Sequence, residues 1–135
     1  MSAASATLLP DGSGAAARLV VGPADTAEAL GSGDLLVLGT PRLIALMELA
    51  ARTIAAADLP SDATTVGVFV SVEHLAPSVV GASITATAVI RTRTDRQIEL
   101  DLEARDDVSA VVIGRGLHRR VVVNRASFLA KVTVI

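Results

Sequence analysis

The fold is decided by residues 40–58, TPRLIALMELAARTIAAAD, the only stretch of the chain with a strong helical pattern. Thr40 stands directly before Pro41, as a capping hydroxyl stands before a proline at the first position of a helix. Residues 42–58 consist largely of Ala, Leu and other strong helix formers, and Pro60 stops the helix. The pattern therefore predicts a helix about 25 Å long over residues 42–58.

Only two charged residues lie in the middle of this helix, Glu48 and Arg52, so we expect the helix to be buried on nearly all sides. A carboxylate in such a place is costly to desolvate unless it is paired or neutralised. Glu48 precedes Arg52 by four residues, in the orientation that favours an ion pair along a helix. Glu48 is therefore either half of a structural ion pair or a functional acid, and the spacing leaves both interpretations open.

After the helix, apolar and polar residues alternate with the period of two that is typical of β-strands, most clearly in residues 97–105. We expect four strands there, the last of them bulged at Gly114 and Gly116, at residues 65–73, 83–91, 97–105 and 109–124. The connections are too short for crossover helices, so the strands pair antiparallel. With a short strand at residues 18–22, the fold class is α+β, a sheet wrapped around one long central helix.

The N-terminal part of the chain gives weaker signals. Residues 1–14 are dominated by Ala, Ser and Gly, which predicts a disordered tail, and residues 15–135 form a single domain. Residues 24–33 are small and mostly polar, and we expect a flexible loop there.

Composition excludes several classes of function. The 135 residues are 51% hydrophobic and carry a formal net charge of −2, which argues for a compact core and against a nucleic-acid partner. The chain has no cysteine, so disulfides, thiolate metal sites and a cysteine nucleophile are excluded. No stretch reaches the roughly 20 apolar residues of a membrane span, and the N-terminal residues do not resemble a secretory signal. We expect a cytoplasmic protein that buries part of its apolar surface against a second copy.

Few side chains are candidates for chemistry. His74, at the end of the first long strand, is either half-exposed and inert or functional, and Thr40 is explained by the helix cap alone. His118 lies inside the last strand and has a weaker case than His74. Two histidines without metal-ligand spacing argue against a metal site. Three arginines on the last strand form either a solvated face or a phosphate site: Arg115, Arg119 and Arg120.

Three runs of sequence carry a resemblance to a known family: GTPRLIALMELAARTI, VGVFVSVEHLAPSVVGASITATAVI, and GRGLHRRVVVN with SFLAKV. From about residue 20 to residue 132 the chain resembles the hot-dog-fold thioesterases of the fluoroacetyl-CoA thioesterase type. That family has a Thr before the central helix, a Glu eight residues later and a His 26 residues after the Glu, the spacings of Thr40, Glu48 and His74. Gly67 and Gly81 also fall in register, and the last strand repeats the family's pattern Gly114-x-Gly116-x-His118-x-Arg120.

The resemblance implies a hot-dog fold and a homodimer with an active site at each subunit interface. It implies hydrolysis of an acyl-CoA to the acid and free CoA, with no cofactor and no metal. Glu48 is then the general base or the nucleophile, His74 bonds Glu48 or protonates the departing sulfur, and Thr40 orients them. Gly67 leaves room for the acyl group beside backbone N–H donors. Arg120 would contact the nucleotide phosphates or the entrance for pantetheine.

One position departs from the family. Asp34 stands six residues before Thr40, where the fluoroacetyl-specific enzyme has an aromatic lid residue. A carboxylate does not close a small dry pocket, so a different short- or medium-chain acyl group is expected. Two alternatives remain: a non-catalytic acyl-CoA or small-ligand binding protein of this fold, and a hot-dog hydratase. The hydratases usually have an Asp and a His near the start of the helix, and this sequence has no His there.

Overall fold

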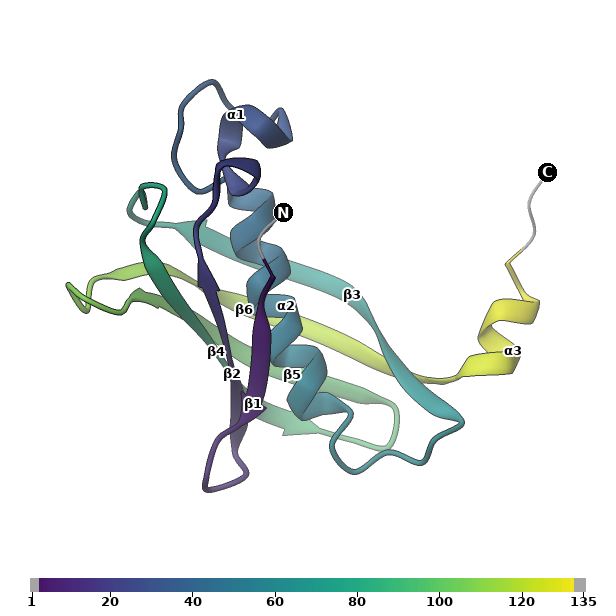
Figure 1. Ribbon diagram of the computed structural model, residues 1–135. Helices are drawn as coiled ribbons and strands as arrows, with labels where there is room; N and C mark the ends of the chain where they lie inside the picture. Colours follow the sequence, from purple (N-terminus) through teal and green to yellow (C-terminus); the bar gives the residue numbers. More distant parts are fainter. Residues whose placement is uncertain (1–2, 133–135) are drawn as a thin grey trace.

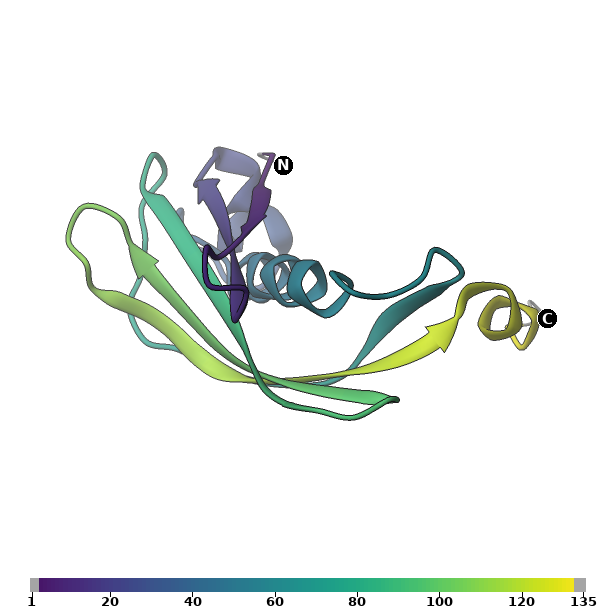
Figure 2. The same ribbon diagram turned by 90° about the horizontal axis from the view of Figure 1, so that it is seen from below.

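The computed structural model describes residues 3–132. A six-stranded sheet, in the order β1-β2-β4-β5-β6-β3, curves around one long helix, α2 (Figure 1). Seen along the helix, the sheet forms a trough and α2 lies on its concave side (Figure 2). The strands are β1 (Ser5–Leu8), β2 (Gly14–Val20), β3 (Ala63–His74), β4 (Ser83–Arg93), β5 (Gln97–Asp106) and β6 (Val112–Asn124). The helices are a 3-10 turn η1 (Pro23–Asp25), α1 (Ala27–Leu30), α2 (Thr40–Ala55) and α3 (Arg125–Ala130).

The central helix is confirmed, with shifted ends. α2 begins at Thr40, with Gly39 as its N-cap, and ends at Ala55, three residues before the expected end at residue 58. Its core-facing side is fully buried against the sheet. The opposite side, around Ala45 and Arg52, is exposed in the single chain. The prediction of a helix buried on nearly all sides therefore holds for only one face of it.

The four strands after the helix are present and every neighbouring pair is antiparallel, as expected. The alternation holds because one face of the sheet packs on α2 while the other is polar. Of the two expected bulges in β6, only the one beside Gly114 coincides with a register shift, between Val112 and Gly114 opposite β5. A Cβ on Gly114 would lie 2.9 Å from Leu43, so this glycine lets the helix approach the sheet.

The N-terminal tail is the clearest error of the sequence interpretation. Residues 5–8 and 14–20 form an antiparallel hairpin, β1–β2, at the edge of the sheet, so the disordered tail expected over residues 1–14 is wrong for these residues. Residues 1 and 2 lie outside the described part of the chain. In β2, Ala15, Ala17 and Leu19 are fully buried under α2. The small side chains of β2 let this strand pack closely against α2.

Two short helices were not expected. Within the loop predicted at residues 24–33, the Thr26 hydroxyl accepts the N–H of Ala29 and starts α1, which ends at Gly31 with a positive φ of 72°. After β6, the Asn124 side chain caps α3 in the same way. α3 projects from the end of β6, away from the rest of the molecule (Figure 1).

Candidate active site

Thr40 and His74 meet where the start of α2 faces the end of β3. The Thr40 Oγ1 and His74 Nδ1 atoms are 2.7 Å apart, a hydrogen bond. The Thr40 hydroxyl does not cap the helix, because Thr40 is the first helical residue and Gly39 takes the N-cap position. The interpretation of Thr40 as a helix cap is therefore wrong, and its hydroxyl instead forms a hydrogen bond with the His74 imidazole.

A pocket of about 310 Å³ opens beside this pair. Apart from Thr40, His74 and Ser32 its lining is apolar: Ala27, Val37, Leu38, Leu75, Ala76 and Pro77. Burial lowers the pKa of His74 below its ordinary value of 6.5, and the nearby Ala76 backbone raises it by less. The imidazole is therefore neutral at neutral pH. Its Nε2 atom is buried and has no hydrogen-bond partner among the described residues.

Glu48, two helical turns further along α2, lies in a second group of side chains. Its Oε2 atom is 3.5 Å from Arg120 Nη1 and 3.7 Å from His118 Nε2. The Arg120 side chain is only 7% exposed, and it donates to the hydroxyl of Thr65 at 2.8 Å and to the Thr65 carbonyl at 3.0 Å. Within residues 3–132 Glu48 makes no ion pair with Arg52, so of the two interpretations of Glu48 the structural pair along the helix is wrong.

Gly67 makes room for this second group. It lies on β3 directly opposite Arg120. A Cβ on Gly67 would lie 3.0 Å from Glu48 Oε2 and 3.1 Å from His118 Cε1, distances that would force the neighbours to move. The missing side chain therefore lets the carboxylate lie against the sheet. A shallow pocket lined by Ala45, Glu48, Leu49, Arg52 and Arg120 leaves that carboxylate accessible.

The structure thus brings the predicted residues together in two groups. Thr40 meets His74, and Glu48 meets Gly67 and Arg120. Along the helix, the eight residues between Thr40 and Glu48 correspond to about 12 Å. Within one chain, no described contact joins Glu48 to His74.

The three arginines of β6 do not form one cluster, because neighbouring residues of a strand face opposite sides of the sheet. Arg120 points toward α2. Arg115 and Arg119 lie on the other face, 3.8 Å from Glu103 and 3.7 Å from Glu99. These two belong to a solvated, ion-paired surface rather than to the site.

His118 is the residue that sequence reasoning undervalued. It is 2% exposed and faces the same side of the sheet as Arg120, two residues away. The period of two could have indicated its position, because residues 118 and 120 must lie on the same face of the strand.

Two further expectations concern the described residues. No group of three or more acidic or histidine side chains in residues 3–132 is arranged to hold a metal ion. None of the helices found there is long and apolar enough to cross a membrane.

Comparison with known proteins identifies the family. Residues 21–126 match the model of the fluoroacetyl-CoA-specific thioesterase family. The fluoroacetyl-CoA thioesterase of Streptantibioticus cattleyicolor is 32% identical over 96 residues, covering 71% of this chain and 68% of that protein. The solved structure of the fluoroacetyl-CoA thioesterase FlK superposes with a TM-score of 0.78 at 26% identity, covering 96% of this chain and 92% of that one. A hot-dog-like protein from Thermanaerovibrio acidaminovorans shares the fold, with a TM-score of 0.76 at 22% identity over 96% of this chain and 87% of that one. The fold is therefore the hot-dog fold, and the chain belongs to the fluoroacetyl-CoA-specific thioesterase family.

Proposed function

We propose that the protein is a cytoplasmic homodimer that hydrolyses a short- or medium-chain acyl-CoA to the acid and free CoA, using Thr40, Glu48 and His74. The observation that carries the proposal is the 2.7 Å hydrogen bond between Thr40 and His74 at the mouth of an apolar pocket. A threonine used as an ordinary helix cap would not make this bond. The family membership supplies the reaction class, thioester hydrolysis.

A second copy would complete the site. β3 is an edge strand, and three consecutive apolar residues on it are exposed: Val68 at 54%, Phe69 at 45% and Val70 at 40%. An unpaired apolar edge of this kind favours pairing with another strand. If two β3 edges pair antiparallel with their centre near Val70, His74 of one copy lies opposite residue 66 of its partner, next to Gly67 and so near the second Glu48. The Glu48 side chain is 40% exposed in the single chain, which leaves it accessible to a second copy.

In the proposed reaction, a water molecule attacks the thioester carbonyl carbon while the Glu48 carboxylate takes its proton. The C–S bond then breaks, and the proton held by Glu48 passes to the departing sulfur. The neutral His74, held by Thr40, donates a hydrogen bond to the reacting group without adding a positive charge. The alternative is direct attack by Glu48, which gives a mixed anhydride that water then hydrolyses. A covalent acyl adduct on Glu48, detected by mass spectrometry after rapid quenching, would indicate this second route, whereas the first route forms no such adduct.

Arg120 is better suited to hold Glu48 than to bind CoA phosphates. Its guanidinium is buried and already donates to Thr65. An arginine that binds phosphate needs its fork of N–H groups free and accessible. We therefore assign Arg120 the role of positioning residue for the carboxylate.

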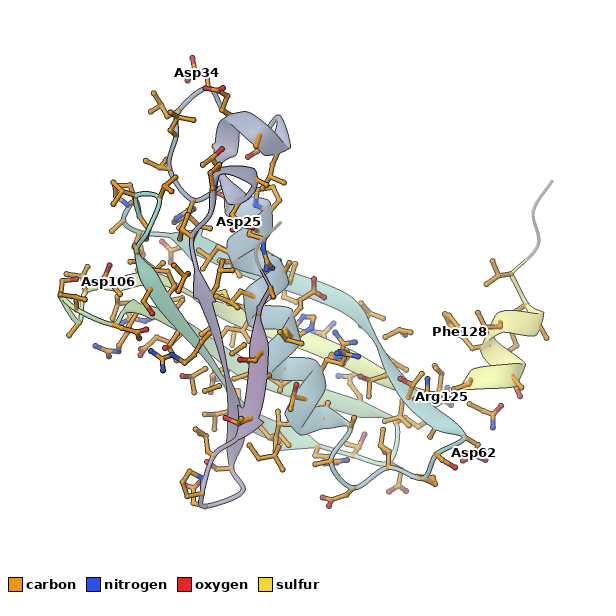
Figure 3. The ribbon with its side chains drawn as sticks, viewed as in Figure 1. Asp25, Asp34, Asp62, Asp106, Arg125 and Phe128 are labelled. Carbon is orange, nitrogen blue, oxygen red and sulfur yellow. The ribbon has the colours of Figure 1, made fainter. Side chains whose placement is uncertain are left out.

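The pocket favours a modest acyl group. Its volume of about 310 Å³ is small for a ligand site, and its lining is mostly apolar. Asp34 lies at the outer tip of the loop before α2, pointing into solvent, and does not cover the pocket (Figure 3). The neighbouring Leu35 and Leu36 are 65% and 63% exposed. We therefore expect acyl groups other than fluoroacetyl to be preferred.

The test is a panel of acyl-CoA substrates assayed by release of free thiol. Glu48→Gln should reduce kcat by about 10²–10⁴-fold, because it removes the base without changing the shape of the side chain. Glu73→Gln is the matched control, since Glu73 is an exposed residue on the same sheet and should keep full activity. Full activity of a folded Glu48→Gln protein would refute the mechanism. Acyl-CoA binding by calorimetry without thiol release would instead indicate a binding protein.

A further inference from the structure

We infer that His118 is a positioning residue for the active site: as a neutral imidazole with its proton on Nδ1, it accepts a hydrogen bond from Arg120 and so holds that guanidinium against Glu48. The inference rests on the proposed function of Glu48. It concerns a buried side chain to which the mechanism above gives no part.

The tautomer follows from the partner on Nδ1. His118 Nδ1 lies 2.7 Å from the carbonyl oxygen of Phe69, and a carbonyl oxygen only accepts hydrogen bonds. The proton of the neutral ring is therefore on Nδ1, and Nε2 presents a lone pair. Arg120 Nη1, which only donates, lies 3.1 Å from that Nε2 atom. Both nitrogens of the ring thus have partners of the correct kind.

The Phe69 carbonyl is available because of an irregularity in β3. The register with β6 shifts between Gly67 and Phe69, so Val68 is an extra residue in the strand. A bulge of this kind interrupts the ladder of backbone hydrogen bonds. The bulge lies between Gly67, which is beside Glu48, and Phe69, whose carbonyl oxygen bonds His118.

His118 supplies the contact that completes the alignment of Arg120. The guanidinium is bound to Thr65 through Nε and Nη2, along one edge of its plane. Its remaining nitrogen, Nη1, lies between His118 and Glu48, at 3.1 Å and 3.5 Å. Without an acceptor at His118, nothing on that side fixes Nη1 toward the carboxylate.

Protonation of His118 would reverse this arrangement. A proton on Nε2 removes the acceptor and places an imidazolium beside the Arg120 guanidinium, while attracting the Glu48 carboxylate 3.7 Å away. The charged groups facing this region are Glu48 and Arg52 on α2 and Arg120 on β6. The residues paired with His118 on β3 and β5 are uncharged, Val70 and Leu100.

The environment keeps the ring neutral. Burial, the largest influence, lowers the pKa of His118 below its ordinary value of 6.5, and the Arg120 charge lowers it further. The bond with Phe69 and the Glu48 charge raise it, but by less in sum. The acceptor form is therefore the one present at neutral pH.

Two matched substitutions separate positioning from simple core packing. In His118→Asn the amide nitrogen replaces Nδ1 and keeps the Phe69 bond, but no acceptor reaches Arg120. In His118→Gln the amide oxygen reaches the place of Nε2, and the Phe69 bond is lost. We expect His118→Asn to reduce kcat by about 10- to 100-fold with KM little changed. His118→Gln should recover kcat to within about threefold of the original protein. Equal losses in the two variants, or no loss in His118→Asn, would overturn the inference.

A measurement independent of activity reads the tautomer directly. The chain has two histidines, so long-range ¹H–¹⁵N spectra of the intact protein contain two imidazoles, and either variant assigns His118. We expect the Nδ1–H form at neutral pH, and a lower His118 pKa in Glu48→Gln because a nearby negative charge is removed. An Nε2–H or charged ring at neutral pH, or a pKa unmoved by Glu48→Gln, would contradict the inference. If no acyl-CoA is hydrolysed by the original protein, the proposed function fails, while the tautomer remains decided by the spectra.

Discussion

Gly67 has no side chain at the point where the Glu48 carboxylate meets the sheet. Its φ is not positive, so the backbone accepts alanine and only the added methyl group matters. That carbon would lie 3.0 Å from Glu48 Oε2 and 3.3 Å from Arg120 Nη1. Substitution at this position therefore probes the geometry of the site rather than the stability of the strand.

We expect Gly67→Ala to reduce kcat by about tenfold or more, because the carboxylate must move away from its place against the sheet. The melting temperature should change little. Thr92→Ala, an exposed position on β4 away from the β3 edge, is the control and should keep its activity. Thiol-release kinetics measure the change in kcat, and thermal unfolding measures the melting temperature. An active Gly67→Ala protein would show that this close approach has no functional importance.

The two groups of residues differ in how readily the sequence reveals them. The Thr40–His74 pair follows from spacing and the family resemblance, although the helix-capping rule favoured another use for the hydroxyl. The partners of Glu48 follow from a strand register that is shifted by one residue at Val68. Periodicity alone does not show such a shift, so the sequence offered only Arg52, four residues along the helix, as a partner and not Arg120.

At the scale of elements, the start of α2 is fixed by a buried ion pair. Asp25, which is fully buried, accepts a hydrogen bond from Arg42 Nε at 3.0 Å and another from the Gly22 N–H at 2.8 Å. Its backbone carbonyl also accepts the Gly39 N–H. The turn before α1 is thereby tied to the first turn of α2, where Thr40 lies.

Asp25→Ala should destabilise the protein by about 3–5 kcal/mol, because it leaves the Arg42 charge nearly buried without this carboxylate. Equilibrium unfolding in urea measures the change. Asp34→Ala is the control, since Asp34 is exposed at the tip of the neighbouring loop, and its unfolding free energy should stay unchanged (Figure 3). Similar midpoints for the two variants would show that the Asp25 pair contributes nothing to stability.

The strands were predictable because each has one buried face, which imposes a period of two. The central helix was predictable because strong helix formers fill the stretch between Pro41 and Pro60. The β1–β2 hairpin was missed: the strand expected at residues 18–22 covers only the end of β2, although all of β2 alternates. The earlier buried positions of β2 are filled by Ala15 and Ala17, whose small side chains do not mark a strand in the sequence. A strand whose buried positions are alanines is recognised only in the structure, where these residues pack closely against the helix.

At the scale of the whole molecule, the proposed dimer depends on the exposed edge of β3. Val68→Glu places a charge in the middle of that edge and should shift the protein toward monomers. Thiol release should fall with it, because each site would lose its second copy. Val108→Glu changes a loop residue that is 92% exposed and should leave both properties unchanged. Analytical ultracentrifugation gives the masses, and a dimeric, active Val68→Glu protein would exclude this interface.

The stability of the fold should depend on pH through its two histidines. Both have a pKa lowered by burial in the folded state, so the unfolded chain binds more protons below pH 6.5. Their contribution to the free energy of unfolding is therefore complete above that pH and is lost progressively as the pH falls toward the lowered values. The pKa of Asp107 is lowered from 3.8, because its hydrogen bonds with Ser83, Thr85 and Arg18 outweigh its slight burial, so its contribution is lost only in stronger acid.

Urea unfolding followed from about pH 7.5 to about pH 5 should thus show decreasing stability, with a smaller decrease in His118→Asn. Constant stability across this range would contradict the assignment of both rings as neutral in the folded protein.

The extra residue in β3 also determines which changes of chain length the protein can tolerate. Gly67 and Phe69 pair with successive residues of β6, so removing Val68 alone would close the strand into a regular ladder. Every later residue up to His74 would keep its present partner and face, whereas a deletion further along would turn His74 away from Thr40. Shortening the chain at position 68 should therefore yield a folded protein in which the Phe69 carbonyl returns to the ladder and His118 loses its acceptor.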